Sequence, residues 1–334
     1  MTGRHVTAGR LARTAGVLAV ALAVSIAAAV AIGPVHVSLT QALARADSPD
    51  YAILFRTRLP RVLLAGVVGG SLASAGAALQ ALLGNPLACP HLLGISGGAA
   101  VAGVFALIAG ADPVSPLVPL AAFGGALGAI AIVGLGSRAG GRTTPHAVLL
   151  VGVVFNALAA AALMLLNAIV SYTQAQGVLF WIMGSLSTQS YALIAGVTAY
   201  SLVGIAWLMT RTHELNLLAA GEEGALQLGV DVERTRRTVF VAASLLVGAA
   251  VSVSGMIGFV GLIVPHLLRL ALGPDHRIVV PASFLGGAAF LVWADTLART
   301  ALAPVELPVG VVTALAGGPF FLFLLRRHLR RAVR

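Results

Sequence analysis

The chain has 334 residues, of which 59% are hydrophobic and only 10% are charged. Soluble globular proteins carry roughly 25% charged residues, so this composition excludes an ordinary soluble protein and places most of the chain in lipid. No stretch is polar enough to form a separate soluble domain. We therefore predict an all-α integral membrane protein with a single transmembrane domain over residues 1–334.

Ten apolar segments are predicted to cross the membrane, because a bilayer core about 30 Å thick requires about 20 apolar residues in a helix. The first follows several arginines, as a signal peptide does, but its apolar stretch is longer than the usual roughly 7–15 residues, so we expect it to remain uncleaved. In chain order the predicted spans are residues 14–34, 62–83, 92–110, 117–137, 147–170, 190–210, 238–256, 258–272, 279–299 and 308–325.

The placement of arginine predicts the orientation of these spans. With the N-terminus inside, 16 of the 21 basic residues, all of them arginines, fall on cytoplasmic segments and five fall outside. Cytoplasmic loops of membrane proteins carry such an excess of positive charge. The bias predicts both termini in the cytoplasm, an even number of helices and a location in the cytoplasmic (inner) membrane. It also explains the net charge of +10 by topology, without nucleic-acid binding.

The acidic residues argue against proton coupling. None of the 11 falls at the centre of a predicted span, whereas proton-coupled carriers usually place Asp or Glu inside the membrane. Asp295 comes closest, and we expect it to pair with Arg299 four residues later, near the outer surface. The pattern favours an external energy source over the alternative, a stand-alone ion-coupled secondary transporter.

The missing lysine limits how ATP can be used. A standard P-loop needs a lysine on the β- and γ-phosphates, and this chain contains none. If ATP drives the protein, another subunit must hold the ATP and its magnesium ion. We therefore expect this chain itself to bind no cofactor.

An intramembrane enzyme is a further alternative. Residues 94–98 match the G-x-S-x-G pattern of hydrolases around Ser96, but they open a membrane helix and do not follow a strand. The eight histidines lack metal-ligand spacing, and the one cysteine forms no internal disulfide. We predict no catalytic residue and no metal site.

Spaced glycines instead predict close packing between helices. Small residues four apart let membrane helices approach each other closely. The pairs with this spacing are Gly66 with Gly70 and Gly124 with Gly128, and the glycines around Ser96 receive the same interpretation.

The longest cytoplasmic loop covers residues 211–237 and contains a predicted short helix from Glu222 to Leu228. Its carboxylates lie in the first turn, as the helix dipole prefers. Ala225, Leu226 and Leu228 form an apolar edge. Such a helix suits docking into a groove on a partner protein, and a solvated connector explains the pattern equally well.

Ordered motifs over nearly the whole chain after residue 50 resemble one family, the FecCD-type (type II) ABC import permeases for iron-siderophores, haem and vitamin B12. The matching segments are Arg58-Leu59-Pro60-Arg61, Gln80, Asn85-Pro86-Leu87-Ala88, Pro90, Leu93 to Ala99, Gly221-Glu222, Ala225, Leu228-Gly229, Gly258 to His266, Arg269, Asp275-His276-Arg277, Pro281, Asp295, Arg299, Glu306 to Gly310 and Gly318-Pro319-Phe320.

The resemblance implies an architecture of ten helices and a set of partners. A second copy, or a related permease chain, would complete a central path, two ABC ATPase subunits would supply the energy, and an extracytoplasmic substrate-binding protein would deliver the cargo. An iron-siderophore is the first expectation for that cargo, with vitamin B12 and haem left open, as is the choice between a homodimer and a heterodimer.

The resemblance also implies roles for individual residues. Those expected to couple to the ATPase are Leu215, Gly221, Glu222, Ala225, Leu228 and Gly229. Those expected to dock the binding protein are Arg56, Arg58, Arg61 and Arg299. Those expected at the cytoplasmic gate are Asn85, Leu87, Pro145 and His146, the last two replacing small hydroxyl residues of some relatives.

Overall fold

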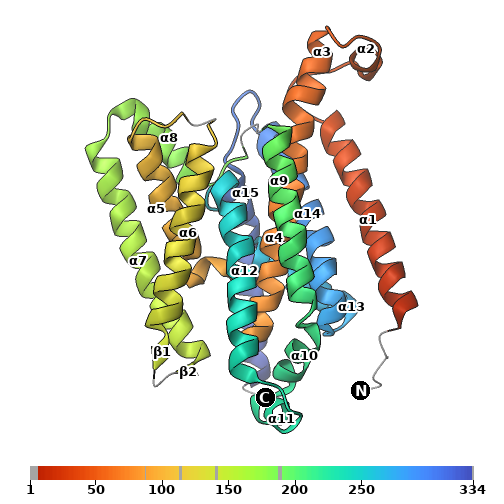
Figure 1. Ribbon diagram of the computed structural model, residues 1–334. Helices are drawn as coiled ribbons and strands as arrows, with labels where there is room; N and C mark the ends of the chain where they lie inside the picture. The colour runs from red at the N-terminus through yellow and green to blue at the C-terminus, as the bar shows by residue number, and fades with distance from the viewer. Residues whose placement is uncertain (1–6, 87, 113–114, 140–141, 187–189, 333–334) are drawn as a thin grey trace.

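The computed structural model describes residues 7–332 except 87, 113–114, 140–141 and 187–189. Its long helices run side by side in one bundle (Figure 1). They are α1 (Ala8–Ala31), α4 (Leu59–Leu82), α5 (Ile95–Ile108), α6 (Leu117–Gly136), α7 (Pro145–Ile169), α9 (Tyr191–Met209), α12 (Val232–Ser254), α13 (Val260–Leu272), α14 (His276–Thr300) and α15 (Val309–Ala332).

Short elements connect these helices at the two ends of the bundle. They are α2 (Leu39–Ala44), α3 (Pro49–Tyr51), the π-helical η1 (Ala52–Arg58), the 3₁₀ turn η2 (Pro90–Leu93), the antiparallel pair β1 (Arg138–Ala139) and β2 (Arg142–Thr143), α8 (Tyr172–Ile182), α10 (Thr212–Ala220) and α11 (Glu222–Gln227).

The predicted all-α membrane fold is confirmed. Among the described residues, seven helices are long and apolar enough to cross a membrane, and three shorter apolar helices lie at Ile95–Ile108, Val260–Leu272 and Val309–Leu322. Each of the ten overlaps one predicted span. The N-terminal end of α1 and the C-terminal end of α15 both lie at the end of the bundle that holds α10 and α11 (Figure 1).

Helix α4 forms the centre of the bundle, and its apolar stretch is 94% buried. It packs against α12, α13 and α14. Glycines permit this approach, because a Cβ at Gly76 would collide with the carbonyl oxygen of Gly261 on α13. A Cβ at Gly69 would likewise collide with the carbonyl oxygen of Gly287 on α14.

The glycine expectations are partly wrong. A Cβ on Gly70 would lie 2.5 Å from the ring of Phe284, so this position is tightly packed. Gly124 and Gly128, in contrast, face open space. The contact between α5 and α6 is made by Gly125, whose Cβ would collide with the carbonyl oxygen of Gly98. The spacing rule therefore selected the right helix but the wrong face.

Two outer segments that we expected to be polar connections are helical. Residues 52–58 form η1, which runs directly into α4. Residues 172–182 form α8, which begins with a capping box between Ser171 and Gln174. The first backbone N–H groups of a helix have no acceptor within the helix, and a side chain that accepts a hydrogen bond from one of them satisfies that donor. The Ser-x-x-Gln pattern at 171–174 is the signal that identifies α8.

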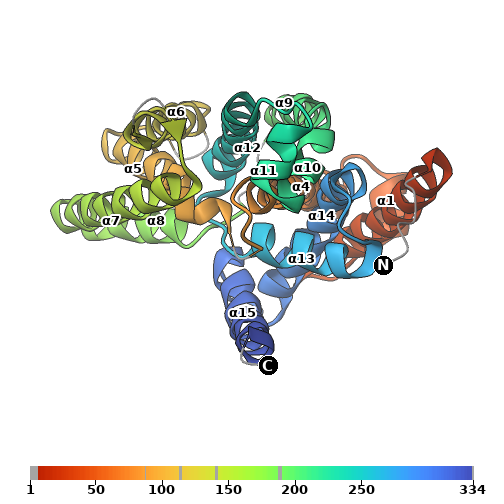
Figure 2. The ribbon, with the colours of Figure 1, turned by 90° about the horizontal axis from the view of Figure 1, so that it is seen from below.

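Seen from below, three helices stand away from the centre of the molecule (Figure 2). Helices α7 and α15 project on two sides, and α1 lies at a third edge, packed on α14. Helices α6, α12 and α9 lie along the edge opposite α15 (Figure 2).

Candidate functional site

The end of the bundle with α10 and α11 carries the segment that we expected to couple to an ATPase. Gly221 has φ 138° and Gly229 has φ 80°, so both adopt backbone conformations that favour glycine. These two residues bracket α11 and let the chain turn sharply on both sides of it. Their identity is thus explained by the local backbone.

The side chains of α11 divide into a buried and an exposed set. Leu226 is 55% exposed and the following Leu228 is 69% exposed, so both present apolar surface at the tip of the molecule. Ala225 is 1% exposed and Leu215 on α10 is fully buried. Direct contact with a partner therefore fits Leu226 and Leu228, whereas Ala225 and Leu215 hold the segment in place. We did not include Leu226 among the coupling residues.

Polar contacts fix this segment to the transmembrane helices. Glu222 on α11 accepts from Arg236 on α12 at 2.5 Å. Asn216 on α10 donates to Asp275 at 2.9 Å and accepts from the backbone N–H of His276 at 2.8 Å, both at the start of α14. A movement of α10 and α11 would therefore act directly on α12 and α14.

Asp275 is ionised over the physiological pH range. Its partial burial would raise the pKa of this carboxyl, but hydrogen bonds from Arg277 and Asn216 outweigh burial and hold the pKa at about 2. The side chain also caps α14 by accepting from the backbone N–H of Arg277 at 2.9 Å.

A cluster of charged residues lies at the opposite end of α4 and α14, which is the predicted outer end. Asp295 is completely buried, and it accepts from Arg61 Nε and from Arg299 Nε, each at 3.0 Å. Glu306 also accepts from Arg61, at 2.7 Å. The predicted pairing of Asp295 with Arg299 is confirmed, and both side chains are buried. The contribution of Arg61 from a second helix was not predicted.

Two arginines of this region bind the end of α1. Arg58 donates to the carbonyl oxygens of Val30 at 3.2 Å and Ala31 at 3.0 Å. Arg299 donates to the carbonyl oxygen of Ala29 at 3.3 Å. The last turn of a helix leaves its carbonyl groups without intrahelical partners, so these guanidinium groups cap α1.

This geometry corrects the expected placement of the docking arginines. Arg58 is 4% exposed and Arg299 is 3% exposed, so neither presents a free guanidinium to an external partner. Arg61 is held by Asp295 and Glu306. Of the four, Arg56 on η1 is exposed. Docking of a binding protein at this end stays a prediction, carried by Arg56.

The expected gate residues lie near the inner ends of α4 and α7. Pro145 is the first residue of α7, after Thr144, whose hydroxyl caps the helix by accepting from the N–H of Ala147 at 3.3 Å. His146 is exposed. Asn85 follows α4, and its backbone N–H donates to the carbonyl oxygen of Gln80 at 3.1 Å. Leu87 lies outside the described residues.

The start of α7 and the end of α4 meet at a shared cavity. Thr144 and Val148 line the same pocket as Leu82 and Leu83. The segments that end α4 and begin α7 are therefore adjacent, and their role as a gate stays a prediction.

Polar contacts at two places hold the backbone near this gate. Gln80 donates to the carbonyl oxygen of Gly261 at 3.3 Å and accepts from Arg269 at 3.1 Å, which ties α4 to α13. Asn156 on α7 donates to the carbonyl oxygen of His91 in η2 at 2.6 Å. We did not predict Asn156, because a single polar residue in an apolar helix shows no partner at sequence level.

The structure places neither the hydrolase pattern around Ser96 nor a metal-ligand set in a catalytic arrangement within the described residues. Ser96 is 4% exposed and lies in the first turn of α5, preceded by the 3₁₀ turn η2. A hydrolase elbow would place it after a strand and open to substrate. Within the described residues, no group of three or more His, Cys, Asp or Glu side chains is arranged to hold a metal ion.

Comparison with known proteins identifies relatives over almost the entire chain. The model of the FecCD transport family matches residues 20–327. The cobalamin import system permease protein BtuC of Halobacterium salinarum is 46% identical over 83% of this chain and 74% of that protein. The hemin transport system permease protein HmuU of Yersinia pestis is 43% identical over 83% of this chain and 84% of that protein.

A solved structure shares the fold. It is described as an inward-facing conformation of a metal-chelate type ABC transporter, and it superimposes with a TM-score of 0.82 at 30% sequence identity. The match covers 95% of this chain and 99% of the other.

Proposed function

Because the chain belongs to the FecCD transport family of type II ABC import permeases, we propose that it conducts a metal chelate into the cell with energy from partner ATPase subunits. The observation that carries this proposal is the family match over residues 20–327, combined with ten apolar helices in a bundle whose solved relative has a TM-score of 0.82. None of the relatives reported above is described as an ion-coupled carrier.

The cytoplasmic tip supports an ATPase partner. The chain lacks the lysine that a standard P-loop needs, so ATP with its magnesium ion belongs to another subunit, and two such subunits are proposed. Leu226 and Leu228 expose apolar side chains at the end of the bundle where a soluble subunit has access. Exposed apolar residues beside charged ones are typical of docking surfaces. Both chain termini would then lie in the cytoplasm.

Two further partners complete the proposal. Helices α7 and α15 project from the bundle and expose large apolar side chains, among them Leu158 at 65% and Leu315 at 71% (Figure 2). A second copy, or a related permease chain, would cover these faces and enclose the path. On the outer side, exposed Arg56 is the proposed contact for acidic residues of a substrate-binding protein.

The proposed cargo is a metal chelate of the kinds named for the relatives. Those names include cobalamin and hemin for the two proteins above and ferric citrate for YfmD of Bacillus subtilis, which is 38% identical over 84% of this chain. An iron-siderophore, haem and cobalamin are therefore the three cargoes to compare in one uptake assay.

Co-purification tests the proposed assembly. The tagged chain, extracted from its native membrane, should retain a P-loop ATPase in equal amount. The double substitution Leu226→Ser and Leu228→Ser should abolish that retention. The matched control is Leu43→Ser with Leu302→Ser, which removes two similarly exposed leucines, 73% and 59% exposed, at the outer end. ATPase retention by the tip variant would place the docking contact elsewhere, and absence of any ATPase from the wild-type preparation would contradict the proposal.

A further inference from the structure

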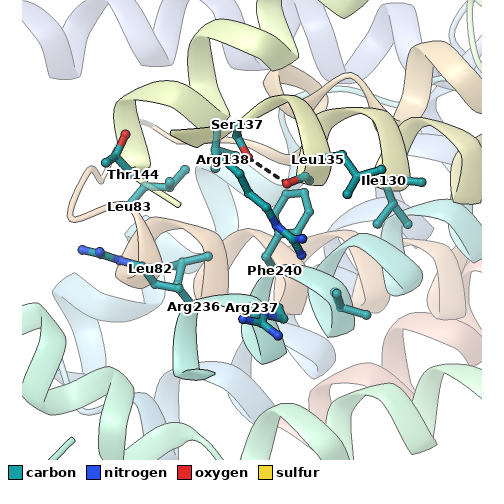
Figure 3. A pocket seen from close by; sticks show the side chains of 14 residues that line it. Leu82, Leu83, Ile130, Leu135, Ser137, Arg138, Thr144, Arg236, Arg237 and Phe240 are labelled. Carbon is teal, nitrogen blue, oxygen red and sulfur yellow. Dashed lines mark hydrogen bonds between the residues drawn. The ribbon is translucent and has the colours of Figure 1, made fainter. Parts of the chain in front are cut away.

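An apolar cavity of about 320 Å³ lies at the inner end of the bundle, on the edge opposite α15. It is enclosed by the last turns of α4 and α6, the first turn of α7 and the start of α12, and Figure 3 shows its lining. Its apolar walls are formed by Leu82, Leu83, Ile130, Leu135, Val148 and Phe240.

Three arginines line the same cavity. Arg138 follows α6 in β1, whereas Arg236 and Arg237 lie near the start of α12. Figure 3 shows the guanidinium of Arg138 reaching across the pocket toward Phe240 and Arg237. The described residues that line the cavity include no Asp or Glu, so positive charge from two segments is concentrated there without an acid among the walls.

The arginines have unused hydrogen-bonding capacity. Among the described residues, Arg138 and Arg237 form no ion pair, and both are exposed. Arg236 binds Glu222 through its terminal nitrogens, but its buried Nε–H has no acceptor within the described structure. Within the described part of the cavity lining, Arg138 and Arg237 are therefore the guanidinium groups available to an anionic acceptor.

The height of the cavity in the bundle indicates the kind of anion. Helix α6 ends at Gly136 and α12 begins at Val232, so the arginines lie where lipid headgroups meet the inner ends of the helices. The apolar walls continue from the arginines toward the bilayer core along Leu135 and Ile130. A free phosphate would contact the arginines but not the apolar walls, whereas a phospholipid would contact the arginines with its phosphate and the walls with an acyl chain.

We propose that this cavity binds an anionic phospholipid of the cytoplasmic leaflet, with its phosphate on Arg138 and Arg237 and an acyl chain along the apolar walls. Basic pockets between transmembrane helices on the cytoplasmic side suit such headgroups. The assignment to the cytoplasmic leaflet rests on the proposed orientation. Other inner arginines, such as exposed Arg234 on the same helix, lie outside this cavity.

Lipid binding to the purified full chain tests this inference without any transport assay, so its failure is distinct from failure of the proposed function. Native mass spectrometry would follow titration with dioleoylphosphatidylglycerol, dioleoylphosphatidylcholine and glycerol 3-phosphate. We expect phosphatidylglycerol to bind about 25-fold more tightly than phosphatidylcholine, since about fivefold is gained for each of the two arginines near the headgroup. Glycerol 3-phosphate should not bind at the same concentrations.

Two pairs of variants locate the site. Arg138→Gln with Arg237→Gln should weaken phosphatidylglycerol binding by about 25-fold. The control, Arg13→Gln with Arg234→Gln, removes the same charge from exposed inner positions outside the cavity and should leave binding unchanged.

The second pair tests the apolar walls. A Cβ at Gly134 would lie 3.7 Å from the ring of Phe240, an ordinary contact, and Gly134 lines the cavity, so Gly134→Leu should place its side chain in the cavity. Gly128→Leu, on the same helix but facing open space, is its control. We expect phosphatidylglycerol binding to fall with Gly134→Leu alone.

Four results would overturn the proposal. Equal affinity for the two phospholipids would show that the headgroup charge is not recognised. An equal loss of phosphatidylglycerol affinity in the arginine variant and its control would show that the lipid is attracted by the positive surface in general. Binding of glycerol 3-phosphate as tightly as phosphatidylglycerol would make this a site for free phosphate esters. Unchanged binding in Gly134→Leu would show that no acyl chain enters the cavity.

Discussion

Removal of the buried acid Asp295 should destabilise the protein strongly. Asp295 is completely buried between Arg61 and Arg299, which both donate to it at 3.0 Å. The substitution Asp295→Asn keeps the shape of the side chain but removes the charge, and it leaves two guanidinium groups with Glu306 as the one remaining acid of the cluster. The three helices that meet here would then be held around an uncompensated positive charge.

The magnitude follows from the partners that remain. Breaking a buried ion pair by removing one member costs about 3–5 kcal/mol. Arg61 retains Glu306 at 2.7 Å, and Arg299 retains the carbonyl oxygen of Ala29 and the hydroxyl of Thr296, each at 3.3 Å. We therefore expect a loss of about 3 kcal/mol in the free energy of unfolding, at the lower end of that range.

A companion variant separates charge balance from packing. Asp295→Leu with Arg299→Met removes one charge of each sign and leaves Arg61 paired with Glu306. Since apolar replacement of a complete buried pair is often neutral, the double variant should lose less stability than Asp295→Asn. Asp47→Asn, at an exposed outer position, is the control and should change stability by less than about 0.5 kcal/mol.

Denaturant titration of the purified chain in detergent micelles, followed by tryptophan fluorescence, measures these differences. The reasoning is refuted if Asp295→Asn unfolds like Asp47→Asn, or if the double variant is less stable than the single one.

Three further predictions use the same purified protein. Gly76→Ala should lower the free energy of unfolding by about 1–3 kcal/mol, because the new Cβ meets the backbone of Gly261. Gly124→Ala faces open space and should be neutral or slightly stabilising. Equal unfolding midpoints for the two variants would contradict the close packing at Gly76. The folded pKa of Asp275 is about 2, below an unfolded value of about 3.9, so the ionised carboxylate stabilises the fold at neutral pH and this stabilisation is lost as pH falls from about 5 toward 2. Solvent screening limits the stabilisation to about 1 kcal/mol. A stability difference between wild type and Asp275→Asn that persists at pH 2 would contradict this prediction. Arg56→Glu should weaken association with the binding protein several-fold at low salt and little at high salt, and unchanged surface-plasmon-resonance affinity at low salt would move the contact elsewhere.

The helices were predictable because their signal is local. A membrane-spanning helix needs about 20 consecutive apolar residues, and the chain shows ten such segments in order. The helix boundaries differ from the predicted ones where a capping side chain sets the start of the helix. Helix α1 begins at Ala8 because Thr7 caps it, six residues before the predicted start at 14. Helix α14 begins at His276, capped by Asp275, three residues before the predicted start at 279.

The outer charges could not be placed from the sequence, because their partners are distant along the chain. The pair of Asp295 and Arg299 follows helical spacing and was predictable, but Arg61 lies 234 residues from Asp295. The carbonyl oxygens that bind Arg58 belong to the end of α1, 27 and 28 residues earlier. A pattern of outer arginines therefore suggested docking, whereas the structure gives most of them an internal role.

The end of the bundle that holds α10 and α11 shows the same limit on a smaller scale. Glycines with positive φ at 221 and 229 were implied as functional, and the backbone alone accounts for them. An apolar edge on α11 was predicted, yet Ala225 lies on its buried side while Leu226 and Leu228 are exposed. Which face of a six-residue helix is covered depends on tertiary contacts, so composition identified the helix but not its exposed face.

The central claim is tested most directly by transport in proteoliposomes that contain this chain with the ATPase and binding protein that co-purify with it. The account predicts that a metal chelate accumulates only when ATP reaches the ATPase, and that Leu226→Ser with Leu228→Ser abolishes accumulation. Accumulation by the chain alone, without ATP and driven by an imposed proton gradient, would contradict it.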